Sequence, residues 1–122
     1  MSLVEKQVLF AKLLGRLLSY ATEQGIFCTM GECYRSPAVA QLNALKGIGI
    51  ANSLHTQRLA VDLQLFRPDG PDAWTYLAAG TEPEYAKLGD FWCSLTDLCR
   101  WGGHFRPKPD YDHYSLTHNG AQ

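Results

Sequence analysis

The sequence predicts an α+β fold in which a small, mainly antiparallel sheet is flanked by about three helices. Apolar residues recur at helical spacing near the start of the chain and again after residue 83, whereas a central segment has the two-residue period of a strand. The expected order is helix, strand, helix, strand, helix, strand. The 122 residues suit one domain and leave no room for two, so we expect 1–122 to form a single domain.

The N-terminal segment predicts a helix followed by a strand. Ser2 and Glu5 have the spacing of a capping box, and apolar residues then recur at helical spacing. Gly25 is a natural helix stop, because glycine accepts the left-handed backbone that often ends a helix. A short strand is expected at 26–29.

A second helix is expected after this strand. Ser36 can act as its N-cap, Pro37 suits the first helical position, and Gly47 closes the element. The residues at 47–52 are expected to form a loop.

The second half of the chain predicts two strands with a third helix between them. Within 53–66, two sets of residues alternate with the period of a strand. They are Leu59, Val61, Leu63 and Leu65 on one side and Ala60, Asp62, Gln64 and Phe66 on the other. Residues 68–71 predict a turn, and 83–99 an amphipathic helix that ends before Trp101. A short strand is expected from His113.

Charge and hydropathy exclude several classes of function. The formal net charge is −1, and the basic residues are scattered and matched by acids, so we expect no nucleic-acid partner. No apolar run approaches the length that crosses a bilayer, so we expect no membrane insertion. The N-terminal apolar residues are interrupted by charges and do not form a signal peptide, so we expect a protein that is cytoplasmic when synthesised. We also expect a monomer.

The four cysteines do not have the spacing of a structural zinc site. Cys28 and Cys33 form C-x4-C, and Cys93 and Cys99 form C-x5-C, whereas zinc knuckles use C-x2-C. We expect free, mostly buried thiols.

Two residues near the central strand carry chemistry. Asp62 lies in the middle of an apolar strand, where a carboxylate is costly to bury unless it is paired or bound to metal. His55 lies seven residues earlier, in the segment that enters this strand, so the two side chains can converge on one ion. The alternative is that Asp62 caps a loop or pairs with an arginine and that His55 is exposed.

A second cluster, Asp110-x-x-His113, follows a proline-containing segment. Catalytic zinc generally takes three protein ligands and leaves a position for water. His55, Asp62 and His113 make a set of two histidines and one carboxylate, and Asp110 remains available as a base. The alternative is that Asp110 is an ordinary turn residue.

These segments resemble a known family. Residues 53–62, SLHTQRLAVD, are similar to the S-x-H-x-x-G-x-A-x-D motif of the D-alanyl-D-alanine carboxypeptidase and L-alanyl-D-glutamate endopeptidase family of zinc peptidases. Asp110-x-x-His113 resembles the second metal motif of the family, 34–37 its upstream arginine motif, and 101–105 the segment before the last ligand. The motifs occur in the family order.

The resemblance implies a role for each matched residue. His55, Asp62 and His113 would bind Zn²⁺. Asp110 would be the general base for the water that zinc activates, and Arg35 would steady the carbonyl oxygen or a substrate carboxylate as negative charge develops.

Three further residues would support the site, and one departs from the motif. The resemblance gives Ser53, Tyr34 and Trp101 second-shell or substrate-binding roles. Arg58 stands where the motif has glycine, which bears on the geometry of the local loop but removes no metal ligand.

The function that the resemblance implies is a zinc-dependent peptidase of the endolysin type. It would hydrolyse the stem peptide of peptidoglycan, at the L-Ala–D-Glu bond. With this resemblance, we expect 1–122 to be a single catalytic peptidase domain without a separate cell-wall-binding domain. The small size is similar to that of phage or prophage lysis enzymes, so we expect action on the cell wall after release by another factor. Two alternatives are a D,D-carboxypeptidase or dipeptidase on D-Ala-D-Ala, and a non-catalytic metal-binding module.

Overall fold

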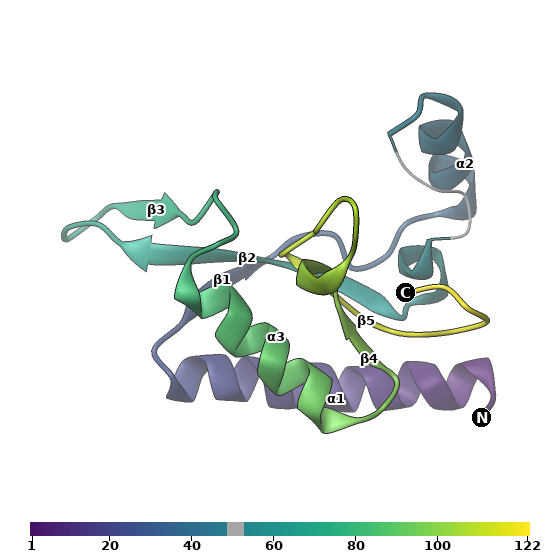
Figure 1. Ribbon diagram of the computed structural model, residues 1–122, viewed down its shortest axis with the longest axis horizontal. Coiled ribbons are helices and arrows are strands. Elements are labelled where there is room, and N and C mark those ends of the chain that lie inside the picture. The colour runs from purple at the N-terminus through teal and green to yellow at the C-terminus, as the bar shows by residue number, and fades with distance from the viewer. Residues whose placement is uncertain (49–52) are drawn as a thin grey trace.

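A computed structural model describes residues 1–48 and 53–122. Its elements along the chain are α1 (Leu3–Glu23), β1 (Phe27–Met30), α2 (Pro37–Leu45), the 3-10 helix η1 (Leu54–Gln57), β2 (Ala60–Pro68), β3 (Trp74–Tyr76), α3 (Pro83–Leu95), β4 (Cys99–Trp101), the 3-10 helix η2 (Gly102–His104) and β5 (His113–Leu116) (Figure 1). Of the loop expected at 47–52, residues 49–52 lie outside the described residues.

The described strands form one antiparallel sheet in the order β1-β2-β5-β4, and β3 pairs with the far end of β2. Phe66 of β2 pairs with Phe27 of β1 and with Tyr76 of β3, so these two strands lie on opposite sides of β2. Three helices and a small antiparallel sheet confirm the predicted α+β class.

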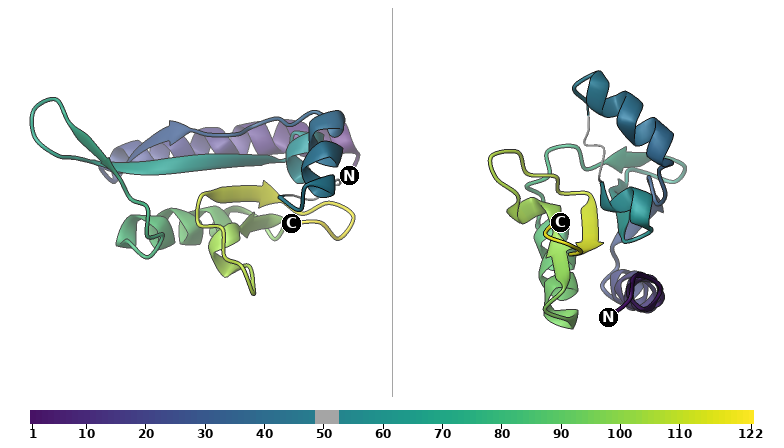
Figure 2. Two further views of the ribbon diagram at one scale, coloured as in Figure 1. Left: turned by 90° about the horizontal axis from the view of Figure 1, so that it is seen from above. Right: turned by 90° about the vertical axis from the view of Figure 1, so that its right-hand side faces the viewer.

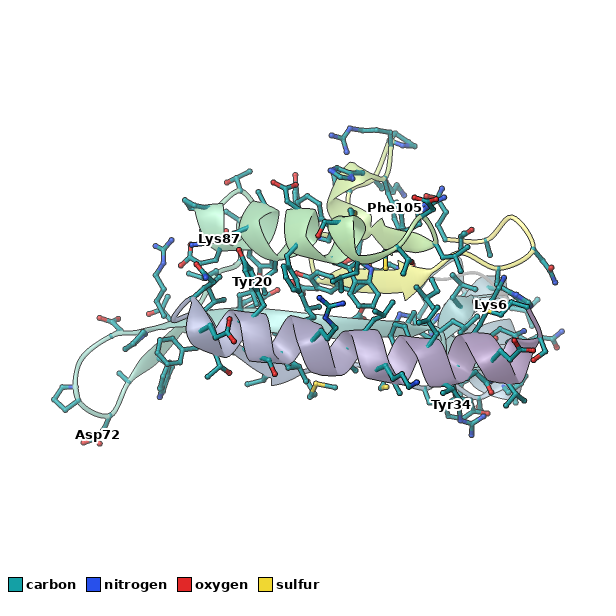
Figure 3. The ribbon with its side chains drawn as sticks, turned by 90° about the horizontal axis from the view of Figure 1, so that it is seen from below. Lys6, Tyr20, Tyr34, Asp72, Lys87 and Phe105 are labelled. Atoms are coloured by element: carbon teal, nitrogen blue, oxygen red, sulfur yellow. The ribbon has the colours of Figure 1, made fainter. Side chains whose placement is uncertain are left out.

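The helices α1 and α3 lie side by side and cover one face of the sheet (Figures 1 and 3). Tyr20 of α1 lies between them (Figure 3). Its ring stacks on that of Phe91 of α3, with ring centroids 3.9 Å apart. The helix α2 projects away from the sheet (Figure 2). The largest buried side chains of the core are Leu17, Leu59, Leu63, Leu65, Tyr85, Leu88, Trp92, Tyr114 and Leu116.

The expected alternation in β2 is confirmed and decides where the site lies. Val61, Leu63 and Leu65 are fully buried in the core. Because successive strand residues point to opposite faces, Asp62 and Gln64 lie on the other face of the sheet, away from the core helices. The candidate ligand is therefore placed on the face that α1 and α3 leave free.

The local helix signals are also confirmed. Ser2 and Glu5 form both hydrogen bonds of the capping box at the start of α1. The Ser36 hydroxyl accepts a hydrogen bond from the Val39 amide at the start of α2, and Gly47 has a positive φ of 74° just after that helix.

Two expectations about the second half of the chain are wrong. The third helix ends at Leu95 rather than near residue 99, because the backbone of Thr96 is extended, with φ −152° and ψ 164°. Cys99 instead begins β4, and the turn after Pro68 leads into β3; neither of these two strands was expected. Each has only three residues, too few for a period-two pattern to stand out.

The cysteines and the membrane prediction can also be compared with the structure. All four cysteines lie in the described part of the chain and are free thiols. Only Cys99 is buried and Cys33 is exposed, so the expectation of mostly buried thiols is wrong. No described helix combines the length and the apolar character that a bilayer crossing requires.

Candidate metal centre

Three elements each contribute one side chain to a cluster on the free face of the sheet. His55 comes from η1, Asp62 from β2 and His113 from β5. Asp62 and His113 are directly opposite each other in the β2–β5 ladder, so their side chains leave the sheet on the same face. The strand register thus brings together two residues that are 51 positions apart in the sequence.

The donor atoms have the spacing of a tetrahedral metal site. His55 Nε2 lies 3.5 Å from Asp62 Oδ1, and His113 Nδ1 lies 3.7 Å from the same oxygen. Neighbouring ligands of tetrahedral zinc, with bonds of about 2.0–2.2 Å, lie about 3.3–3.6 Å apart. All three donor atoms are within 4.8 Å of one another. Two imidazoles and one carboxylate therefore suit a zinc ion, provided that the donor atoms move somewhat closer together.

The electrostatics of Asp62 also suit a cation. Burial alone raises the pKa of its carboxyl group, but the imidazoles of His113 and His55 outweigh this effect and lower the pKa to about 2. The carboxylate is thus ionised at neutral pH. Its Oδ1 atom is buried without a hydrogen-bond partner, which is costly unless a positive group completes the site.

The 3-10 helix η1 fixes His55 through local hydrogen bonds. Ser53 is its N-cap: the hydroxyl accepts a hydrogen bond from the His55 amide at 3.2 Å. The Thr56 hydroxyl donates to the Ser53 carbonyl at 2.6 Å. Ser53 is buried, with 7% of its surface exposed, and these two hydrogen bonds hold the turn that carries His55.

Arg58, at the position where the resembled motif has glycine, has a left-handed backbone conformation. Its φ of 57° and ψ of 36° lie in the left-handed region, which glycine adopts most easily. The chain therefore makes the turn into β2 despite the substitution. The Arg58 guanidinium lies over the Tyr34 ring, 4.1 Å from its centroid, and Tyr34 is 45% exposed. Tyr34 thus contacts Arg58 at the surface.

The segment from Gly102 to His113 positions Asp110 beside the cluster. The Asp110 amide donates to the Gly102 carbonyl at 2.8 Å, and the His113 amide donates to the Asp110 carbonyl at 3.2 Å. Asp110 as a whole is exposed, but neighbouring atoms partly shield its carboxyl group from water, and this raises the pKa of that group. The negative charge of Asp62 raises the pKa further, whereas His113 lowers it. A carboxylate with a raised pKa is a stronger base than an ordinary aspartate.

Trp101 supports this segment from the core side. It is 6% exposed, and its indole Nε1 donates to the Tyr111 carbonyl at 2.9 Å. A Cβ atom placed on Gly89 or Gly103 would come within 2.3 Å of the indole ring, so both glycines are needed for the ring to fit. The indole therefore acts on the loop and does not face the surface.

Arg35 lies next to His55, but its side chain is paired. Its amide donates to the His55 carbonyl at 3.1 Å. Its guanidinium forms a two-pronged ion pair with Glu32, a residue that the sequence analysis did not single out. The only sequence signal for this pair is the i,i+3 spacing of opposite charges, which is common on protein surfaces.

Other titratable and aromatic residues lie outside the cluster. Among the described residues, the metal-type grouping contains His55, Asp62 and His113 but not His104, whose ring packs against Trp101. The ring of Phe105 packs against His113 with centroids 5.4 Å apart, and so helps to cover the cluster.

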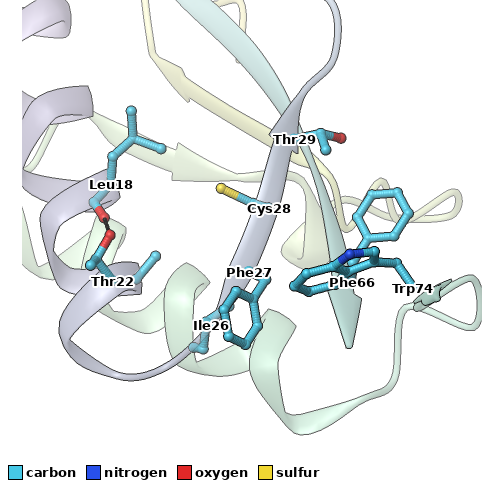
Figure 4. A pocket seen from close by; sticks show the side chains of 9 residues that line it. Leu18, Thr22, Ile26, Phe27, Cys28, Thr29, Phe66 and Trp74 are labelled. Atoms are coloured by element: carbon cyan, nitrogen blue, oxygen red, sulfur yellow. Dashed lines mark hydrogen bonds between the residues drawn. The ribbon is translucent and has the colours of Figure 1, made fainter. Parts of the chain in front are cut away.

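A hollow of about 540 Å³ lies elsewhere, between the end of α1 and the β2–β3 hairpin (Figure 4). Its lining includes Leu18, Cys28, Phe66 and Trp74 and is mainly apolar. Phe66 is four strand residues beyond Asp62, which is about 13 Å along the strand. This hollow is therefore separate from the candidate metal centre.

Comparison with known proteins supports the fold. No known family profile matches the chain, and no curated protein sequence matches it. Among solved structures, the L-Ala D-Glu endopeptidase ChiX of Serratia marcescens is similar, with a TM-score of 0.63. The two sequences are 21% identical, and the match covers 88% of this chain and 77% of that one. The likeness shows that the α+β arrangement described above is shared with that protein.

Proposed function

We propose that the protein is a zinc peptidase that hydrolyses the stem peptide of bacterial peptidoglycan. The observation that carries the proposal is the convergence of His55, Asp62 and His113, with Asp110 on the adjoining loop. The similarity in fold to a protein named as an L-Ala D-Glu endopeptidase supports this substrate class and favours the L-Ala–D-Glu bond.

In this proposal the metal ligands, Asp110 and Arg35 each have a separate role in hydrolysis. His55, Asp62 and His113 would hold the zinc ion, which would supply a Lewis acid and lower the pKa of a bound water from 15.7 to about 7. Asp110 accepts a proton from the attacking water and returns it to the departing amine; the raised pKa of its carboxyl group makes it a stronger base than an ordinary aspartate. The Arg35 guanidinium, which is ion-paired with Glu32 beside His55, would stabilise negative charge on the carbonyl oxygen.

The test is the clearing of purified cell walls by the zinc-loaded protein. Asp110→Ala is expected to lower the rate by about 10²–10⁴ while zinc remains bound, because only the base is lost. His113→Ala is expected to lose both clearing and zinc. Two controls are expected to keep both: Asp72→Ala, at the exposed tip of the β2–β3 hairpin (Figure 3), and His104→Ala, outside the cluster.

The outcomes separate the alternatives. The masses of the released fragments distinguish cleavage at L-Ala–D-Glu from cleavage at D-Ala-D-Ala. Full activity of Asp110→Ala would show that another group is the base. A folded, zinc-loaded protein that cleaves neither bond would instead be a metal-binding module without catalytic activity.

A further inference from the structure

Glu32 lies just beyond the end of β1, where the main chain ties it to a candidate ligand. The β1–β2 pairing continues past Met30: the Gly31 amide donates to the Asp62 carbonyl at 2.8 Å, and the Asp62 amide donates to the Glu32 carbonyl at 2.8 Å. The position of Glu32 relative to the cluster is therefore set by backbone hydrogen bonds.

The Glu32 carboxylate lies between Arg35 and His55. Arg35 Nε donates to Glu32 Oε2 at 3.1 Å, and the terminal guanidinium nitrogen of Arg35 pairs with Oε1. The same Oε1 atom lies 3.7 Å from His55 Nδ1. The side chain of Glu32 is 34% exposed, so this junction is partly shielded from solvent.

The His55 ring needs an acceptor at this position. Its Nε2 faces Asp62, and its Nδ1, on the other side of the ring, is buried without a hydrogen-bond partner. A neutral imidazole that binds metal through Nε2 carries its proton on Nδ1, and such protons are almost always donated to a carboxylate, a carbonyl or water. A shift of about 1 Å or less brings Glu32 Oε1 to hydrogen-bond distance.

We infer that Glu32 is a positioning residue: its carboxylate accepts a hydrogen bond from Nδ1–H of His55 and forms the ion pair with the guanidinium of Arg35. One carboxylate thus fixes the tautomer and orientation of a metal ligand and the direction of the neighbouring cation. The inference rests on the metal centre of the proposed function and deepens it. It predicts that Glu32 controls metal affinity without being a metal ligand.

The test measures zinc affinity by competition with a chromogenic chelator. Glu32→Ala is expected to weaken zinc binding about 10–100-fold, the usual effect of removing such a partner. The zinc affinity of Glu32→Gln should lie between that of Glu32→Ala and that of the wild type, because the amide oxygen still accepts the hydrogen bond but carries no charge. The matched control is Glu84→Ala, which breaks an ion pair with Arg67 away from the site. In that pair, too, Nε and a terminal guanidinium nitrogen of the arginine donate to the two carboxylate oxygens, at 2.5 and 2.7 Å.

A second measurement separates a direct effect on His55 from a general structural one. Arg35→Ala removes the ion pair but keeps the carboxylate that can accept a hydrogen bond from His55, so zinc affinity should fall less than in Glu32→Ala. In NMR spectra of the zinc-loaded protein, the Nδ1 proton of His55 should be protected in the wild type and exchange rapidly in Glu32→Ala.

Several results would overturn the inference. Glu32→Ala binding zinc as tightly as Glu84→Ala would do so, as would a wild-type protein that binds no zinc. Hydrolysis is not measured, so a protein that binds zinc but cleaves no peptide would overturn the proposed function and leave the role of Glu32 standing. Circular dichroism of each metal-free variant checks that it is folded.

Discussion

Arg58 shows at the scale of one residue how a motif position can change while its backbone is retained. A left-handed conformation costs a non-glycine residue about 1–2 kcal/mol. The guanidinium contact with Tyr34 recovers part of this, because an exposed cation–π pair is worth about 0.5–1 kcal/mol. The turn into β2 is thus kept at a small net expense in stability.

This account predicts an unusual order of stability at position 58. Arg58→Gly and Arg58→Ala both remove the contact with Tyr34 and differ only in the Cβ atom. Because φ is positive there, the glycine variant should be more stable by about 1 kcal/mol, the reverse of the order at ordinary positions. Urea unfolding of the two metal-free variants measures the difference. An alanine variant as stable as the glycine variant would mean that the backbone at residue 58 is not strained.

Single residues also show what the sequence could reveal of the site. His55, Asp62, Asp110 and His113 were predicted from the sequence because they fall in motifs that resemble those of a zinc peptidase family, and the structure brings His55, Asp62 and His113 together. Glu32 was not predicted, because His55, whose Nδ1 its carboxylate approaches, lies 23 positions away in the sequence and comes near only in the folded chain. Residues that act through another residue carry little signal of their own in a single sequence.

At the scale of elements, the long ones were predictable and the short ones were not. The helices α1 and α2 have capping signals at one end and a glycine after the other, and β2 is long enough to show alternation. The strands β3 and β4 have three residues each, and their pairing depends on β2 and β5, which are distant in sequence. Their hydrogen bonds come from tertiary context, which local periodicity cannot report.

The segment from η2 to β5 provides a test of an element held by close packing. A Cβ atom on Gly102 would lie 2.0 Å from the Asp110 carbonyl oxygen and 2.8 Å from His113 Cβ. Gly102→Ala must therefore displace the main chain that carries both residues. We expect a loss of about 1–3 kcal/mol in the free energy of unfolding, together with weaker zinc binding.

The control for this variant makes the same substitution where space is free. Gly15 lies in the middle of α1 with nothing within 4 Å of an added Cβ atom, so Gly15→Ala should stabilise the protein by about 0.5–1 kcal/mol. Chemical denaturation gives both changes. If Gly102→Ala were also neutral or stabilising, the contact with Asp110 would not constrain the loop.

For the whole molecule, the candidate metal centre lies where three separate elements of the chain meet. His55, Asp62 and His113 belong to η1, β2 and β5, so one ion would fasten a loop and two strands together. These residues do not form the core, which lies on the opposite face of the sheet. The fold should therefore persist without metal and become more stable when metal binds.

Removing the metal should accordingly lower the thermal midpoint without abolishing the fold. With free zinc at 100 times its dissociation constant, binding stabilises the folded state by about 2.7 kcal/mol, which corresponds to roughly 10 °C for a chain of this size. Zinc also binds cysteines in an unfolded chain, and the four free thiols would reduce the shift. Asp62→Asn is the control, because it keeps every cysteine and loses the central ligand. A shift in the wild type alone, measured by scanning calorimetry with and without chelator, would assign the stabilisation to this site; equal shifts in both proteins would assign it elsewhere.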